Sequence, residues 1–371
     1  MLGYHTAGST DHGWGPRRLQ VFVADEDVAE VTALCWHDEP MGTVRWGIVG
    51  PGRIAAHVAA DFPLVPDAEL VAVASRSRQR AAAFASEHSI ARAHGSYRDI
   101  VADPEVDVLY IATPHPQHHA IALAALRAGK AVLVEKAFTA TVDGAVNIID
   151  TARAAGVFAM EAMWTRFQPA VVAARQLIAD GAVGEVRQVQ ADLGVDRAYD
   201  PTDRLFDPAK GGGAMLDLGV YVVSFAQYFL GTPDTVTATG SLAPTGVDAE
   251  VGLLLGYLDG RSAALQVSLR NPTPGQARIF GTGGWIDVLP RFHHPQTIVL
   301  HRSGAEPETI TRPPTGGGYA HELIEVTECL LADRTESAVM PLADTLAVQT
   351  VLNTGCEQLG VRHAEDTSVV V

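Results

Sequence analysis

The sequence predicts an α/β protein in which a doubly wound parallel sheet is followed by an α+β domain on a mainly antiparallel, open sheet. The 371 residues exceed what a single hydrophobic core usually holds, so we expect more than one domain. Strand-like apolar runs alternate with helical segments up to residue 163, and from residue 164 short alternating strands follow one another. We therefore divide the chain into residues 1–40, 41–163 and 164–371.

The first forty residues differ from the rest of the chain. They hold seven acidic and two basic residues and precede the first clear strand. We interpret them as an extension that takes no part in catalysis.

The second segment, residues 41–163, alternates strands with helices. The strand at 107–112 is almost continuously apolar, which is typical of a parallel sheet buried on both faces. The predicted strands cover residues 44–49, 69–74, 107–112, 131–134 and 157–160. The predicted helices cover residues 54–61, 79–88, 117–128 and 141–155.

The third segment, residues 164–371, begins with a helix at 170–180. Its strands alternate apolar and polar residues, as expected for an antiparallel sheet with one solvated face. These strands cover residues 186–193, 235–239, 251–258, 262–269, 277–280 and 297–300. Two helices, 319–332 and 342–357, close the chain.

Composition excludes several classes of protein. With 27 basic and 43 acidic residues the net charge is −16, which argues against nucleic-acid or anionic-membrane partners. No apolar run approaches the roughly 20 residues that a membrane helix needs. Cys35, Cys329 and Cys356 lie far apart and form neither a disulfide framework nor a metal-type spacing, so we expect a cytoplasmic protein.

Residues 50–55 form a G-x-G-x-x-A loop directly after the first strand and open the first helix. Gly50 permits the tight turn, Gly52 lets the backbone approach a pyrophosphate, and Ala55 keeps helix and strand close. The amino end of the helix, with Arg53 and Ile54, offers free N–H groups to the phosphates. The loop predicts a dinucleotide site in a Rossmann domain.

The end of the second strand predicts which dinucleotide binds. An NAD site usually carries Asp or Glu there, which would repel a 2′-phosphate. This chain instead has the hydroxyl of Ser75 and the guanidinium of Arg76, which suit that phosphate. We therefore expect NADP rather than NAD.

Lysine is rare in this chain. Only three of the 27 basic residues are lysines, so a lysine at an expected ligand-binding position is a candidate functional residue. Lys136 follows the fourth strand, at the sheet edge where ligands bind in open parallel sheets. The residues expected beside the cofactor at this edge are Thr113, Pro114, Glu135 and Lys136.

Taken together, these motifs resemble the glucose–fructose oxidoreductase, inositol dehydrogenase and rhizopine-catabolism (Gfo/Idh/MocA) superfamily, and most of all its dimeric dihydrodiol dehydrogenase and NADP-dependent xylose dehydrogenase branch. The motifs are residues 50–55, 113–118, 135–136, 160–167 and 211–221. The resemblance implies a Rossmann domain, and a second domain whose open sheet mediates formation of a homodimer or homotetramer. It also implies His118 near the cofactor and Trp164, Arg166 and Phe167 near the substrate or the dimer edge.

The resemblance further implies that Lys136, Tyr221 and Asp217 form the catalytic group. Hydride transfer from an alcohol needs a partner for the hydroxyl proton. A free Tyr has a pKa of about 10, and we expect the ammonium of Lys136 to lower that of Tyr221. Asp217 would share a helix face with Tyr221 and bind substrate hydroxyls or orient Lys136. Ala137 stands where the family has proline, in a peptide that is commonly cis.

The sequence thus predicts an NADP-dependent oxidoreductase that interconverts a secondary alcohol and a carbonyl of a sugar, cyclitol or cyclic diol. Two alternatives stay open: an enzyme with tightly bound nicotinamide and no net redox change, and a nicotinamide-binding sensor. The pairs His118-His119 and His293-His294 lack a third ligand at useful spacing, so we expect no catalytic metal.

Overall fold

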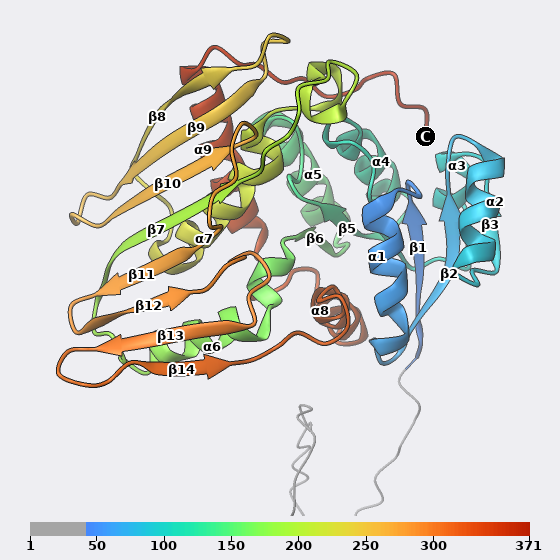
Figure 1. Ribbon diagram of the computed structural model, residues 1–371. Coiled ribbons are helices and arrows are strands. Elements are labelled where there is room, and N and C mark those ends of the chain that lie inside the picture. The colour runs from blue at the N-terminus through green and yellow to red at the C-terminus, as the bar shows by residue number, and fades with distance from the viewer. Residues whose placement is uncertain (1–41) are drawn as a thin grey trace, which may run out of the picture. The chain divides into compact units, whose positions relative to one another are not determined.

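The computed structural model describes residues 42–371, and the predicted extension of residues 1–40 lies outside them. Two sheets dominate this part of the chain, one parallel and one mostly antiparallel (Figure 1). The fold class predicted from the sequence is therefore confirmed.

The first sheet has six parallel strands in the order β3-β2-β1-β4-β5-β6. Because the order reverses between β1 and β4, their connections leave to opposite faces and open a crevice at their carboxyl ends. The strands are β1 (Val44–Val49), β2 (Ala68–Ala74), β3 (Arg92–His94), β4 (Val108–Ile111), β5 (Ala131–Glu135) and β6 (Ala159–Ala162). The helices are α1 (Arg53–Asp61), α2 (Arg78–Glu87), α3 (Tyr97–Val101), α4 (His115–Arg127) and α5 (Val142–Ala155).

Most elements of this sheet lie within two residues of their predicted positions. The sequence missed β3 and α3, because three and five residues are too short to display a period. Strand β6 begins two residues later than predicted, since residue 157 still belongs to the turn after α5.

The second sheet has eight strands in the order β14-β13-β12-β11-β7-β10-β9-β8. Only the pair β7 and β10 is parallel, and every other pair is antiparallel. The strands are β7 (Val186–Gly194), β8 (Thr235–Leu242), β9 (Asp248–Gly256), β10 (Ser262–Ser268), β11 (Ala277–Gly281), β12 (Gly284–Val288), β13 (Thr297–Arg302) and β14 (Glu308–Thr311). The sequence missed β12, because its first glycine reads as a turn, and the short polar β14.

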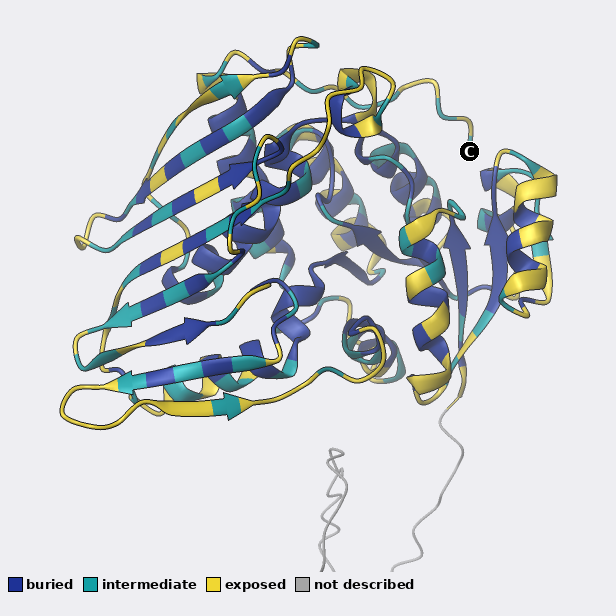
Figure 2. Cartoon of the chain, viewed as in Figure 1, coloured by how far each residue is buried: buried dark blue, intermediate teal, exposed yellow. Residues whose placement is uncertain are grey.

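Helices cover one face of the second sheet and leave the other open. Figure 2 shows the strands striped with buried and exposed residues, the pattern that the alternating sequence predicts. The helices of this part are α6 (Pro169–Ala179), α7 (Val220–Leu230), α8 (Ala320–Leu331) and α9 (Leu342–Gln358). Helix α7 packs on β7 and β10, and α9 packs on α7 and also on α5 of the parallel sheet.

One hydrophobic cluster includes residues of both sheets, from Trp46 in β1 to Leu300 in β13. The hydrophobic interior is therefore continuous across the predicted boundary between residues 163 and 164. The division into two domains at this boundary stays a prediction.

The segment Pro208–Leu230 corrects one expectation. It is 23 residues long and apolar enough, at a mean hydropathy of 1.3, to pass for a membrane span. However, 89% of its most apolar window is buried inside the protein, where α7 lies between α9 and the second sheet. Its apolar side chains are therefore part of the core, as in other buried helices.

Candidate active site

The phosphate loop has the geometry that its glycines predict. Gly50 has φ +93°, and a Cβ on it would lie 3.0 Å from the carbonyl oxygen of Ala112. Gly52 begins α1, no side chain caps this end, and a Cβ on Gly52 would meet nothing within 4 Å. The first N–H groups of α1, at Arg53 and Ile54, therefore face open space where a pyrophosphate can bind.

Beside this loop, polar groups at the end of β4 and the start of α4 lack hydrogen-bond partners among residues 42–371. The hydroxyl of Thr113 is buried without a hydrogen bond, and Pro114 begins α4 without a side-chain cap. Such buried groups are normally satisfied, so their presence fits a polar ligand at the carboxyl end of β4. Arg80, which the sequence analysis missed, donates from Nη2 to the oxygen of Pro51 at 3.3 Å and adds positive charge to the loop.

Ser75 and Arg76 end β2 in different surroundings. Ser75 is buried and its hydroxyl accepts from the amide of Ser77 at 3.2 Å, so it also supports the start of α2. The side chain of Arg76 is exposed beside Tyr97. Burial raises the pKa of Tyr97, and the guanidinium of Arg76 opposes that rise. Arg76 is thus a surface cation at the end of β2.

Of the three lysines, only Lys136 reaches the site. Its Nζ donates to the backbone oxygen of Asp217 at 3.0 Å and lies 4.6 Å from the ring centre of Tyr221. Burial opposes its charge, but Tyr221, Asp217 and Glu135 outweigh burial and raise the pKa of Lys136. The Lys136–Ala137 peptide is cis despite the missing proline. The other two lysines serve the framework: Lys130 donates to backbone oxygens, and Lys210 pairs with a neighbouring carboxylate.

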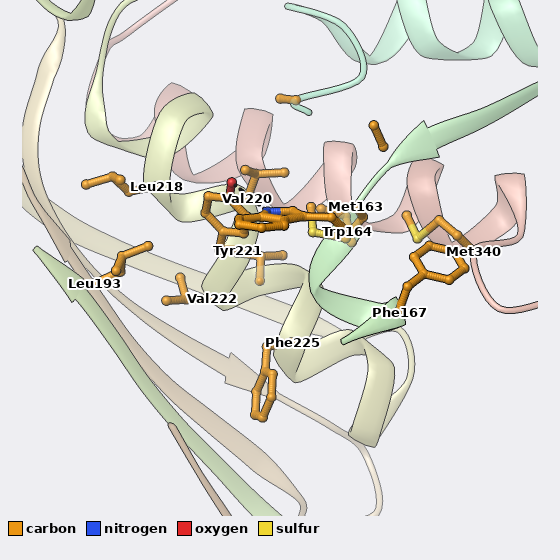
Figure 3. Packing of buried hydrophobic residues seen from close by; sticks show 14 of the residues in the cluster. Met163, Trp164, Phe167, Leu193, Leu218, Val220, Tyr221, Val222, Phe225 and Met340 are labelled. Atoms are coloured by element: carbon orange, nitrogen blue, oxygen red, sulfur yellow. Dashed lines mark hydrogen bonds between the residues drawn. The ribbon is translucent and has the colours of Figure 1, made fainter. Parts of the chain in front are cut away.

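Tyr221 begins α7 and points toward β6 and the loop after it. Its hydroxyl accepts from Nε1 of Trp164 at 3.1 Å, and Figure 3 shows the two rings side by side. Burial raises the pKa of Tyr221, and Lys136 only partly opposes that rise. The expectation that Lys136 lowers this pKa below its ordinary value is therefore wrong, because loss of water around the phenol outweighs the nearby charge.

Asp217 lies in a π-helical turn, Met215–Gly219, that precedes α7. Such turns are frequent at functional sites. Its Oδ1 accepts from Nη2 of Arg204 at 2.7 Å and lies 4.0 Å from Nζ of Lys136. Burial opposes ionisation, but Lys136 and Arg204 outweigh it and hold the pKa of Asp217 below its usual range. Asp217 is thus an ionised carboxylate between two cations.

An aromatic wall, formed by Trp164, His293, His294 and Tyr319, closes one side of the site. The sequence predicted only Trp164, whose ring stacks on that of Tyr319 at 4.3 Å. The ring of His293 lies 4.9 Å from that of Tyr221, and the ring of His294 lies 5.5 Å from that of Trp164. No local sequence pattern predicts these contacts, because the residues in contact lie 72 or more positions apart in the chain.

His118 takes a structural rather than a cofactor-binding position. It is fully buried, its Nε2 lies 2.7 Å from the oxygen of Thr113, and its Nδ1 lies 3.1 Å from that of Ala137. Burial lowers its pKa to about 4. Both nitrogens lie next to backbone carbonyls of the loops after β4 and β5, and the single N–H of the neutral imidazole donates to one of them.

Glu135, also predicted beside the cofactor, is buried below Lys136. Its carboxylate accepts from the hydroxyl of Tyr110 and, at 3.2 Å, from the amide of Lys136. Burial raises the pKa of Glu135, and Lys136 opposes that rise. It supports the charge of Lys136 from beneath.

Arg166 and Phe167 do not lie where the sequence predicted. Only 1% of Arg166 is exposed, and its guanidinium is held entirely by protein groups. The acceptors are Ser224, Gln227, Val339 and Asp344. Phe167 packs in the hydrophobic core, and Figure 3 shows it beside Met340 rather than beside Tyr221. In this structure both side chains are engaged within the protein, so neither offers a free group for the substrate contact that the sequence predicted.

The paired histidines do not gather metal-type ligands. Among residues 42–371, one group of three such side chains brings its ligand atoms within 4.8 Å of one another, namely Asp248, Cys356 and His363. Asp248 accepts from the amide of Met215 at 2.6 Å and so fixes the start of the turn that carries Asp217. Gly213, at φ +121°, makes room for it, since a Cβ there would lie 2.2 Å from Oδ1 of Asp248.

Asp61 holds the aromatic wall from the parallel domain. At the end of α1 its carboxylate accepts from the amides of Gly317, Tyr319 and Ala320 at 2.8 to 3.1 Å. The substitution Asp61→Ala leaves these three amides without an acceptor, and we expect it to lower the free energy of unfolding by about 2–4 kcal/mol. Urea unfolding measures the loss. Asp180→Ala, at an exposed helix end, should change it by less than about 0.5 kcal/mol, and equal losses in both variants would contradict this role of Asp61.

Comparison with known proteins agrees with this geometry. Residues 44–163 match an oxidoreductase family with an NAD-binding Rossmann fold, and residues 171–287 match the Gfo/Idh/MocA C-terminal domain. The trans-1,2-dihydrobenzene-1,2-diol dehydrogenase of Xenopus tropicalis is 36% identical over 329 residues, which cover 86% of this chain and 99% of the relative. The enzyme of that name from Mus musculus is 36% identical over 335 residues, 87% of this chain and 99% of its own.

Solved structures share the fold over the same region. The aldose–aldose oxidoreductase of Caulobacter crescentus, complexed with glycerol, has a TM-score of 0.78 at 25% identity and covers 86% of this chain and 98% of its own. A levoglucosan dehydrogenase with NADH and levoglucosan has a TM-score of 0.78 at 22% identity, covering 86% and 97%. The chain therefore belongs to the Gfo/Idh/MocA family and is a dehydrogenase with an NAD(P)-binding Rossmann domain.

Proposed function

We propose that this dehydrogenase uses NADP to interconvert a secondary alcohol and a carbonyl on a small polyol: a sugar, a cyclitol or a cyclic diol. The observation that carries the proposal is the buried contact of Lys136 with Tyr221 and Asp217 at the carboxyl end of β5. When bound, the nicotinamide accepts or returns the hydride.

Tyr221 is the proposed proton donor and acceptor for the substrate oxygen. Its phenol keeps its proton at neutral pH, because burial raises its pKa. Lys136 lies over the ring and stabilises the phenolate that forms when that proton leaves. Trp164 donates to the phenol oxygen and orients it. The pair can thus give a proton during carbonyl reduction and take one during alcohol oxidation.

Asp217 and Arg204 are the proposed partners for further hydroxyl groups of the substrate. A carboxylate and a guanidinium in contact offer both an acceptor and donors, which suits a polyol. The names of the curated relatives, which are dehydrogenases of a cyclic trans-diol, support a small substrate of this class.

Variants of Lys136 and Tyr221 test the chemistry. We expect Lys136→Met and Tyr221→Phe to lower kcat/KM with a diol or sugar by about 10²–10⁴-fold, because each removes one member of the proton-transferring pair. NADPH formation across a panel of polyols measures the loss. In Lys136→Met the pH profile of alcohol oxidation should also move to higher pH, since Lys136 is the cation that lowers the pKa of Tyr221.

Lys210→Met is the matched control, since Lys210 pairs with Asp207 in a surface loop. It should keep its activity within about twofold. Full activity of both site variants would contradict the proposed roles of Lys136 and Tyr221. Release of NADPH over many turnovers would also exclude an enzyme with bound nicotinamide and no net redox change.

The preference for NADP rests on Arg76. Its exposed guanidinium lies just after β2, in a segment (residues 75–78) that carries no acidic residue, and this supports recognition of the 2′-phosphate. We expect Arg76→Ala to weaken NADP at least tenfold while NAD binding changes by less than about twofold. Titrating the protein with each cofactor and following its tryptophan fluorescence measures the dissociation constants for NADP and NAD. Equal weakening of the two cofactors would contradict the preference.

We further propose that the enzyme forms a homodimer or homotetramer through the open face of the second sheet. This face has a hollow of about 590 Å³ over β7 to β11, and Leu254 there is 55% exposed. We expect Leu254→Arg to dissociate the assembly in sedimentation experiments, because it places a charge in an apolar contact. Leu258→Arg, in the neighbouring hairpin turn, should leave it intact. An unchanged assembly in Leu254→Arg would refute this interface.

The cytoplasm remains our proposed location for the enzyme. It rests on the cysteine pattern, of which Cys329 and Cys356 are free and buried while Cys35 lies outside the described residues. Cell fractionation tests it, and recovery outside the cytoplasm would overturn it.

A further inference from the structure

The C-terminal tail, residues 361–371, returns from α9 to the parallel sheet. Glu365 in this tail accepts from the amides of Ala140 and Thr141 at 3.1 and 2.9 Å, where α5 begins. The tail then passes the amino end of α4, and its end lies on the side of α3 (Figure 1). It therefore crosses the carboxyl edge of the sheet, where a dinucleotide binds.

Hydrogen bonds fix Asp366 at this edge. Its amide donates to the oxygen of Pro116 at 2.7 Å, and its Oδ2 accepts from the side chain of Gln117 at 3.2 Å. Its Oδ1 accepts from the amide of Ser368 at 2.9 Å, which forms a tight turn. Beyond that turn, Val369 and Val371 pack against the hydrophobic cluster that lies between the parallel sheet and its helices. The tail is therefore built into the domain rather than loosely attached.

This arrangement brings a carboxylate near Arg76. The hydrogen bond from Ser368 and the charge of Arg76 both hold the pKa of Asp366 below its ordinary value, so the group is ionised. Across residues 42–371, the tail thus returns an acid to the end of β2 from nearly three hundred positions further along the chain.

The chemistry of the two cofactors gives this acid a meaning. NAD sites use a carboxylate at the end of β2 to accept from the ribose 2′-hydroxyl, whereas a 2′-phosphate needs cations and is repelled by carboxylates. Here β2 itself supplies Ser75 and Arg76, and the tail supplies Asp366. Recognition groups of both kinds therefore lie at the carboxyl edge of the same sheet.

We infer that the C-terminal tail is a cofactor-specificity element, in which Asp366 opposes the 2′-phosphate that Arg76 attracts and so limits the preference for NADP over NAD. The inference rests on the proposed recognition of the 2′-phosphate by Arg76. NADP carries the 2′-phosphate and NAD does not, so the carboxylate weakens NADP and not NAD.

The test is the affinity of Asp366→Asn for each cofactor, measured by fluorescence titration so that no substrate is needed. Asparagine keeps an oxygen for Ser368, and its amide can donate to Oε1 of Gln117, which is buried without a partner. The tail should therefore keep its place. Removing one charge near the phosphate should tighten NADP roughly three- to tenfold and leave NAD unchanged or weaker.

The matched control is Asp200→Asn. Asp200 makes the same kind of turn, accepting from the amide of Thr202 at 2.8 Å, in an exposed loop of the other domain. It should leave both affinities unchanged. The gain for NADP should persist when Asp366→Asn is combined with Arg76→Ala, because a carboxylate repels the phosphate whether or not the guanidinium is present.

The outcomes separate the two proposals. No change in Asp366→Asn, or an equal change for both cofactors, would overturn the role of the tail. If Arg76→Ala alone weakens both cofactors equally, the proposed NADP preference fails. A selective gain of NADP from Asp366→Asn would in that case still support the tail as the group beside the 2′-phosphate.

Discussion

The buried ammonium of Lys136 is the constraint on which the site depends. A charge removed from water is costly unless opposite charges and hydrogen bonds compensate it. Here the compensation comes from Asp217 and Tyr221 on the second domain and from Glu135 beneath. Lys136 stands at the end of a parallel strand, whereas Asp217 stands on the turn before α7 and Tyr221 in the first turn of that helix. The ion cluster therefore fixes the two parts of the chain in register at the proposed site of hydride transfer.

The surrounding contacts can be understood as supports for that register. The ring of His118 lies between the loops after β4 and β5, with its nitrogens within hydrogen-bond distance of three backbone carbonyls. It therefore holds the backbone around Lys136 in place. Asp248 fixes the start of the turn that carries Asp217, at a place where only Gly213 fits. Asp61 holds the segment that bears Tyr319 against Trp164. None of these three side chains needs to touch a substrate to matter for the chemistry.

The sequence predicted the parts of the site that are local in the chain. The turn at Gly50 and Gly52 and the position of Lys136 follow from short motifs, because a strand end, a turn and a helix start are set by neighbouring residues. Arg166 failed for the opposite reason. Its side chain is directed by acceptors from helices 60 to 180 positions away, and no local pattern announces them. Tyr319 and His293 were missed on the same grounds.

Burial and neighbouring charges together determine whether Tyr221 and Lys136 carry their protons. The sequence suggested that the ammonium of Lys136 would make Tyr221 more acidic, yet burial of the phenol dominates and its pKa rises. The pKa of Lys136 rises as well, so both groups hold their protons in the resting enzyme. A site in this state is ready to give a proton to a carbonyl. In the proposed alcohol oxidation Tyr221 first releases its own proton, because only the phenolate can accept the proton of the substrate hydroxyl.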